Sequence, residues 1–198
     1  AAEVAATAKE VAENKADASG NFGTLDLIAA LKWVQSNISS FGGDPSRVTV
    51  FGESAGGRNT WVLVQSPLAK GLFHGAIVES GTLRLSDAVK SEEYDKTALD
   101  YPLYKNNSGE LVAKLVKDAS SLEIIDTAKK LRQVSVDDLY VAAQEPGSEG
   151  DVGTISRPRV FLDDYVLIDS PLELFKDPSR YNSVPIITGT NRDELKMF

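Results

Sequence analysis

The fold is decided by residues 47–57, RVTVFGESAGG. The first five, Arg47–Phe51, are mostly β-branched or aromatic, which is typical of a short buried strand. Gly52–Gly57 interrupt that strand, and an apolar segment of helical character then continues to about Gln65. A Gly-x-Ser-x-Gly turn between a strand and a helix lets a serine project from the top of a sheet.

The serine of this turn, Ser54, is the candidate nucleophile. Glycine at positions 52 and 56 removes side chains that would clash in so tight a turn. Ser54 would also lie at a helix N-terminus, where free N–H groups favour negative charge. We therefore expect the N–H of Ala55 to donate to a developing oxyanion. A short match to Gly-x-Ser-x-Gly also occurs by chance, so the flanking strand and helix carry much of this interpretation.

The residues around the turn predict an alternation of helices and strands. A helix is expected over about 24–39 and a second buried strand at 76–78. In the helix, apolar residues recur at i, i+4, i+7 and i+11, which predicts a core-facing stripe. These are Leu27, Leu31, Val34 and Ile38. Residues 24–81 thus indicate a parallel α/β sheet.

The chain divides into four predicted segments. Residues 1–19 form an N-terminal helical lead, and residues 20–81 contain the first part of the α/β core with the turn. Residues 82–157 are polar and mostly helical, without a strand signal, and are interpreted as a variable helical insertion. The α/β pattern returns at 158–198.

The elements of the two later segments are expected as follows. Helices in the insertion are predicted near 108–118, 121–132 and 135–144. The last segment should contain strands at 165–168 and 184–188, a short helix at 171–175, and the start of another helix at 191. Trp33 and Trp61 fall on predicted helices, where core packing is the better interpretation.

The charge of the chain limits its partners. It has 198 residues, with 21 basic against 29 acidic side chains and a net charge of −8. An acidic surface repels phosphate backbones and anionic membrane surfaces, so neither nucleic acid nor a membrane is expected as a partner. The unbroken apolar runs are also far too short to span a bilayer.

The absence of cysteine excludes disulfides, thiolate zinc sites and cysteine nucleophiles. Together with the lack of a signal-peptide pattern in the first residues, it favours a cytoplasmic location. The acidic pairs Asp137-Asp138 and Asp163-Asp164 lack further ligands at a calcium-binding spacing, so turn and cap roles are expected. We predict no metal and no cofactor.

One long stretch resembles a known family. Residues 41–56, FGGDPSRVTVFGESAG, are similar to the active-site signature of the type B carboxylesterases and cholinesterases. Residues 20–38 resemble the family's helix before that signature, and residues 66–81 resemble the segment after it. Residues 185–194 resemble the strand and turn that carry the family's catalytic acid.

The resemblance implies an α/β-hydrolase fold, a mostly parallel sheet flanked by helices, here incomplete and with a helical insertion. It implies hydrolysis of a small-molecule carboxylic ester through an acyl-enzyme on Ser54, with Glu194 as the acid of the catalytic triad. It also implies that the Ala55 amide contributes to the oxyanion hole, that Glu53 lines the site and that Ser80 supports the acid.

Two parts of the family pattern have no counterpart in this sequence. Nothing in residues 1–19 resembles the His-Gly-Gly-Gly-type oxyanion loop, and no histidine follows Glu194. The single histidine, His74, would give the order Ser, His, acid, whereas this fold uses Ser, acid, His. We therefore expect His74 to be structural or solvent-facing.

The missing base sets an expectation for activity. Without a general base Ser54 is a weak alcohol nucleophile, so the chain alone should be weak or inactive. We expect it to be a segment of a longer enzyme whose remainder supplies the histidine and the oxyanion loop.

Two alternatives to a serine esterase stay open. One is a non-catalytic, cholinesterase-like interaction protein, and the other is an inactive fragment that needs a complementary chain. Interaction proteins with this fold typically lose the nucleophile, whereas Ser54, Glu53 and Glu194 are all present, which favours the enzyme.

Overall fold

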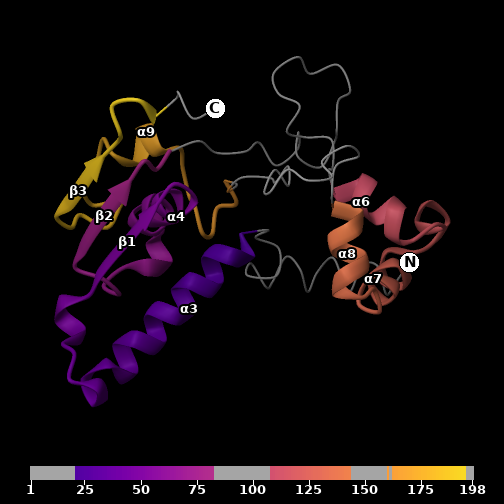
Figure 1. Cartoon of the computed structure of the whole chain (residues 1–198), viewed down its shortest axis with the longest axis horizontal. Helices are drawn as coiled ribbons and strands as arrows, with labels where there is room; N and C mark the ends of the chain where they lie inside the picture. Colours follow the sequence, from indigo (N-terminus) through magenta and orange to yellow (C-terminus); the bar gives the residue numbers. More distant parts are fainter. Residues whose placement is uncertain (1–20, 83–107, 144–159, 161, 195–198) are drawn as a thin grey trace. The chain divides into compact units, whose positions relative to one another are not determined.

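The structure is a computed structural model that describes residues 21–82, 108–143, 160 and 162–194. It divides into two compact units, one formed by 14–85 with 160–198 and the other by 1–13 with 86–159. Each unit is described by itself (Figure 1). The predicted lead at 1–19 lies outside the described residues.

A three-stranded parallel sheet forms the centre of the first unit. Its strands are β1 (Thr49–Glu53), β2 (Gly75–Glu79) and β3 (Ile186–Gly189). Strand β2 lies between the other two (Figure 1). All three run parallel, so their carboxyl ends meet at one edge. The parallel α/β sheet predicted from the sequence is confirmed.

Helices α3 (Phe22–Asn37) and α4 (Ala55–Gln65) build the core of this unit. Helix α4 packs against both β1 and β2. The buried apolar cluster combines residues of both helices with the near face of the sheet, which contributes Ala76 and the partly buried Val50 and Ile186. Short 3₁₀ turns occupy Ile38–Phe41, Pro45–Arg47 and Pro67–Ala69.

The buried stripe of α3 differs from the predicted one. Thr24, Ile28 and Leu31 are its buried residues, of which only Leu31 was predicted. Predicted Leu27 is partly buried and packs against the same core. Because Thr24 is polar, a search for apolar residues alone does not find this buried face. The same face includes Gln35, whose Nε2 donates to the carbonyl oxygens of Pro45 (2.8 Å) and Leu72 (2.9 Å).

The two tryptophans have different environments. The prediction that Trp33 packs in the core is wrong, because its side chain is 54% exposed and its ring lies 5.9 Å from that of exposed Phe41. Trp33 follows buried Leu31 by two residues, which is a rotation of about 200° around the helix axis. Its side chain therefore points away from the core. Trp61 is partly buried against the core, 5.7 Å from the Phe175 ring.

The predicted strand at 165–168 is wrong, because a side chain takes its backbone donors. Asp163 Oδ1 accepts the N–H groups of residues 165–167 at 3.2, 2.8 and 2.9 Å. Asp163 Oδ2 accepts from Asn21 Nδ2 at 2.9 Å, which joins residues 142 positions apart. The turn role expected for Asp163 is confirmed, and buried Val166 and Leu167 anchor the loop against α4.

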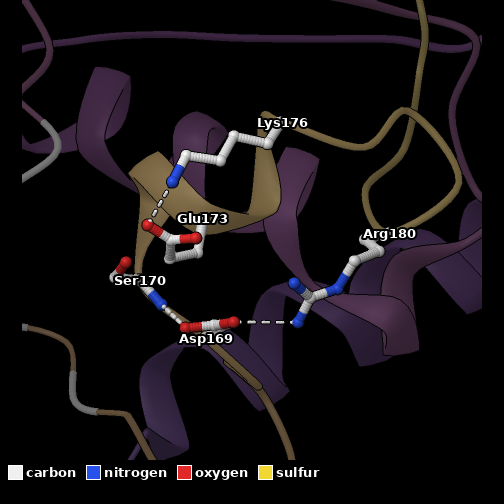
Figure 2. Close-up of polar contacts among 5 residues, drawn as sticks. All are labelled: Asp169, Ser170, Glu173, Lys176 and Arg180. Carbon is white, nitrogen blue, oxygen red and sulfur yellow. Dashed lines mark hydrogen bonds and ion pairs between the residues drawn. The ribbon is translucent and has the colours of Figure 1, made fainter.

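Helix α9 (Pro171–Leu174) and the loop after it are held by ion pairs. Arg180 Nη2 donates to Asp169 Oδ2 at 2.9 Å, and the Ser170 N–H donates to the other oxygen of Asp169 at 2.7 Å. Both contacts are drawn in Figure 2. The Arg180 and Ser170 hydrogen bonds lower the pKa of Asp169. A second pair joins Lys176 to Glu173 at 2.6 Å (Figure 2).

Asn182 then attaches the chain to the end of α4. Its Nδ2 is buried and donates to the carbonyl oxygens of Leu63 and Ser66, each at 2.9 Å. Its backbone N–H donates to the Val64 carbonyl at 2.8 Å. These bonds place residues 182–185 so that the next residues, Ile186–Gly189, pair with β2.

The second unit contains helices α6 (Ser108–Leu115), α7 (Ile124–Leu131) and α8 (Val136–Ala143), with a 3₁₀ turn at Ala119–Ser121. The three helices correspond to those predicted from the sequence, with shorter ends. Residues 108–143 contain no strand. Across both described units, no helix has the length and apolar character needed to cross a bilayer.

The Asp163 carboxylate should dominate the stability of the loop at 163–167. Asp163→Ala leaves three backbone N–H groups and Asn21 without their acceptor, so we expect the free energy of unfolding to fall by about 2–4 kcal/mol. Asp164→Gly is the matched control. Asp164 has φ 53°, which glycine adopts without strain, so it should stay within about 1 kcal/mol of wild type. Urea unfolding measures both, and equal losses would contradict the role of Asp163.

Candidate active site

Ser54 occupies the sharp turn between β1 and α4. Its backbone has φ 53° and ψ −108°, a conformation that non-glycine residues rarely adopt. Two bonds hold it there: the Ser54 N–H donates to the Glu79 carbonyl at 2.9 Å, and the Ser54 carbonyl accepts from the Arg58 N–H at 3.0 Å. The exposed serine is therefore held from the adjacent strand and from its own helix.

The two glycines of the motif have different roles in this turn. A Cβ on Gly52 would overlap the backbone of Gly56 and lie 2.5 Å from its carbonyl oxygen. A Cβ on Gly56 would meet nothing within 4 Å. The clash that was expected at both glycines is therefore present only at position 52. Gly56 takes part in it through its backbone, which lies against Gly52.

Glu194 is held by donors from the ends of two neighbouring strands. Ser80 Oγ donates to Glu194 Oε2 at 2.9 Å, and the Asn191 N–H donates to the same oxygen at 2.7 Å. The Asn191 and Ser80 hydrogen bonds lower the pKa of Glu194. Ser80 itself has φ 51°, and its N–H donates to the Gly189 carbonyl at 2.8 Å. The structure therefore brings Ser80 and Glu194 together, 114 residues apart in sequence.

Ala55 and Glu53 flank the serine. Ala55 is the first residue of α4, where the N–H has no partner within the helix. Glu53 is the last residue of β1, exposed and in register with Glu79 on β2. Both strand ends line a cavity of about 410 Å³ that also contacts Ile77 and Ile187 within the sheet.

This cavity is lined by residues from all three strands and from the segments that follow β2 and β3. Its lining residues are Glu53, Ile77, Val78, Glu79, Ser80, Ile187, Thr188, Gly189, Thr190 and Asn191. Ser54 and Glu194 lie outside this set. The described residues contain no group of three or more His, Asp or Glu side chains that could hold a metal ion.

His74 lies at the opposite edge of the sheet from Ser54. It directly precedes β2, and its N–H donates to the Val48 carbonyl at 2.7 Å. Ser54 follows β1, which is parallel to β2, so about 20 Å of strand separates the two residues. His74 cannot serve as the base for Ser54 in this arrangement.

The sequence reasoning missed two features of the site. One is the Asn191 amide that binds Glu194, and the other is the close approach of Gly57 and Gly81. A Cβ on Gly57 would lie 2.9 Å from the Gly81 Cα, and a Cβ on Gly81 would lie 2.6 Å from the Gly57 carbonyl carbon. For the glycine contact, the sequence signal was Gly81 itself, which directly follows Ser80 at the end of a predicted strand.

A parallel sheet that presents a strained serine between a strand and a helix, with a carboxylate beyond a later strand, is the arrangement of an α/β-hydrolase. Comparison with known proteins agrees. The sequence model described as "Carboxylesterase family" matches residues 11–198. The chain belongs to the carboxylesterase family.

Individual relatives give the same result. Carboxylesterase 1E of Rattus norvegicus is 41% identical over 179 residues, which cover 89% of this chain and 30% of the relative. The liver carboxylesterase of Sus scrofa is 36% identical with the same coverage. This chain therefore spans about 30% of the length of these relatives.

Solved structures of esterases are similar to this chain. A PNB esterase superposes with a TM-score of 0.65 at 32% identity, covering 89% of this chain and 34% of the esterase. A carboxylesterase of Geobacillus stearothermophilus gives a TM-score of 0.65 at 30% identity, covering 89% and 33%. The α/β-hydrolase fold expected from the sequence is confirmed.

The glycine before the serine should tolerate no side chain. Gly52→Ala forces the turn open against the Gly56 backbone, so we expect a loss of about 2–3 kcal/mol in unfolding free energy. Gly56→Ala adds the same methyl group into open space and should cost less than about 1 kcal/mol. Thermal unfolding of the two variants compares them directly, and a larger loss in Gly56→Ala would contradict this geometry.

Removing the Ser80 hydroxyl should change the titration of Glu194. In the wild type the folded-state pKa lies below the unfolded value, so this group stabilises the fold above the unfolded pKa and loses that contribution as the pH falls through the folded pKa. Ser80→Ala removes one donor to Oε2 and should raise the pKa toward its ordinary value, with the Asn191 amide keeping part of the depression.

The measurement is an NMR titration of the Glu194 carboxyl carbon. Thr190→Val is the control, because Thr190 lines the same cavity without a hydrogen bond to Glu194. An unchanged Glu194 titration in Ser80→Ala would show that the Ser80 bond does not form in solution.

Proposed function

We propose that this chain carries the nucleophile and the acid of a carboxylic ester hydrolase, with Ser54 attacking the ester and Glu194 as the triad acid. One observation carries the proposal: two consecutive residues at the end of β2 hold both groups. The Glu79 carbonyl accepts the Ser54 N–H, and the Ser80 hydroxyl donates to Glu194. The strain at Ser54 is typical of a functional turn.

The chemistry follows from these positions. Ser54 Oγ adds to the ester carbonyl carbon while a base takes its proton, and the alcohol then leaves with a proton to give an acyl-enzyme. Water hydrolyses the acyl-enzyme in a second step of the same kind. The Ala55 N–H at the start of α4 donates to the oxyanion in both steps. Glu53, the last residue of β1 and next to the nucleophile, lines the site in this proposal.

Glu194 has one oxygen suited to orienting a base. Oε2 already accepts from the Ser80 hydroxyl and the Asn191 N–H, and we propose that Oε1 accepts an imidazole N–H. The lowered pKa keeps the carboxylate ionised, so it can stabilise an imidazolium formed during attack.

We propose that the base and the remaining oxyanion donors come from further polypeptide, since His74 lies at the far edge of the sheet. The uncovered face of the sheet supports this. Phe51 and Ile187, in register on either side of Ile77, are 75% and 68% exposed, whereas parallel sheets are normally covered on both faces. The chain also spans only about 30% of its relatives. Alone it should be weak or inactive, because loss of one triad member costs about 10⁴-fold.

An interaction protein without catalysis is the second candidate. The same exposed apolar face could bind a partner, and this is the observation that favours it. A protein without catalysis would not need the strained backbone of Ser54 or the two hydrogen bonds that hold Glu194, which is why we propose the enzyme.

A fluorophosphonate label read by intact mass tests the proposal. We expect one label per molecule on Ser54 in the protein completed by its further polypeptide, and labelling slower by about 10³–10⁴-fold in the 198-residue chain alone. Ser54→Ala should abolish the label, whereas Ser36→Ala on the exposed surface of α3 should keep it. A label that survives Ser54→Ala, or a completed protein that takes none, would reject Ser54 as the nucleophile.

A further inference from the structure

We infer that Gly81 is a positioning residue that sets the placement of Ser54 relative to Glu194. This inference rests on the proposed function, because it concerns how the proposed nucleophile and acid are held together. Gly81 follows Ser80 at the end of β2, and it contacts the first turn of α4 through backbone atoms alone.

The contact between Gly81 and Gly57 leaves no space for a methyl group from either side. A Cβ on Gly81 would lie 2.6 Å from the carbonyl carbon of Gly57 and 2.9 Å from its Cα, and 2.7 Å from a methyl carbon of Val78. A Cβ on Gly57 would lie 2.8 Å from the Glu79 carbonyl oxygen. Most of these atoms belong to the backbone, so a rotamer change cannot relieve the overlap, and α4 or the end of β2 must move.

Either movement would disturb the site. If α4 moves, Ser54 moves with it, because the Ser54 carbonyl is bonded to the Arg58 N–H in the first turn of that helix. If the end of β2 moves, Ser80 shifts, and its hydroxyl leaves the 2.9 Å bond to Glu194. The Gly81 contact is thus the point where the nucleophile side and the acid side of the site meet directly.

A glycine outside the site provides a matched control. Gly23 is exposed at the start of α3, which contributes no residue to the site. A Cβ on Gly23 would meet nothing within 4 Å. Gly23→Ala therefore makes the same chemical change without moving α4 or β2.

The experiment compares wild type, Gly81→Ala and Gly23→Ala by two measurements on folded protein. One is the rate of fluorophosphonate labelling of Ser54, and the other is the NMR titration of the Glu194 carboxyl carbon. We expect Gly81→Ala to slow labelling at least tenfold, to raise the pKa of Glu194 toward its ordinary value, or both, depending on which side moves. Gly23→Ala should change neither quantity.

A merely structural glycine would give a different result. Gly81→Ala would then lower the unfolding temperature while the folded molecules kept the wild-type labelling rate and Glu194 titration, and that outcome overturns the inference. If Gly81→Ala does not fold, Gly57→Ala makes a smaller intrusion at the same contact, and the same two measurements decide.

Failure of the proposed function is distinguishable from failure of this inference. A wild-type protein that is never labelled, even when completed, would reject Ser54 as the nucleophile. In a protein whose Ser54 does label, a wild-type labelling rate together with a wild-type Glu194 titration in Gly81→Ala would overturn the inference while leaving Ser54 as the nucleophile.

Discussion

The hydrogen bond from the Ser54 N–H to the Glu79 carbonyl is the constraint on which the rest of the site depends. It extends the pairing of β1 and β2 by one residue, into a turn that a serine would not adopt unaided. Because Glu79 is followed by Ser80, the same strand end also binds Glu194. The site is therefore an extension of the sheet, and the register of β1 and β2 fixes the positions of Ser54 and Ser80.

Buried or partly buried polar side chains join segments that are distant in sequence. Asp163 accepts from Asn21, and Asn182 donates to the end of α4, so β3 and the loops before it are held against elements formed more than 100 residues earlier. Such hydrogen bonds are directional, and a buried polar group without its partner is destabilising. They therefore fix one placement of each segment, whereas apolar contacts alone are compatible with several.

The local elements were largely predictable from the sequence, and polar side chains account for two of the errors. The serine turn and α4 follow from residue type and spacing. The strand predicted at Arg47–Phe51 is present but runs over Thr49–Glu53, because Pro45–Arg47 form a 3₁₀ turn. The strand expected at 165–168 fails because Asp163, a nearby side chain, takes the backbone donors. The stripe of α3 shifts because Thr24 and Gln35 are on its buried face. Trp33 is exposed because its position on the helix points it away from buried Leu31.

By itself the sequence determined the carboxylesterase family, the parallel α/β class and the identity of Ser54 and Glu194 as the candidate nucleophile and acid, because these depend on short motifs read in order. Only the tertiary structure decided that Ser80 and Asn191 bind one oxygen of Glu194, that His74 lies at the wrong edge of the sheet, and that Gly81 abuts Gly57. The physical reason is that strand direction and register bring residues together across long stretches of chain, and no local pattern encodes which backbone atoms then meet.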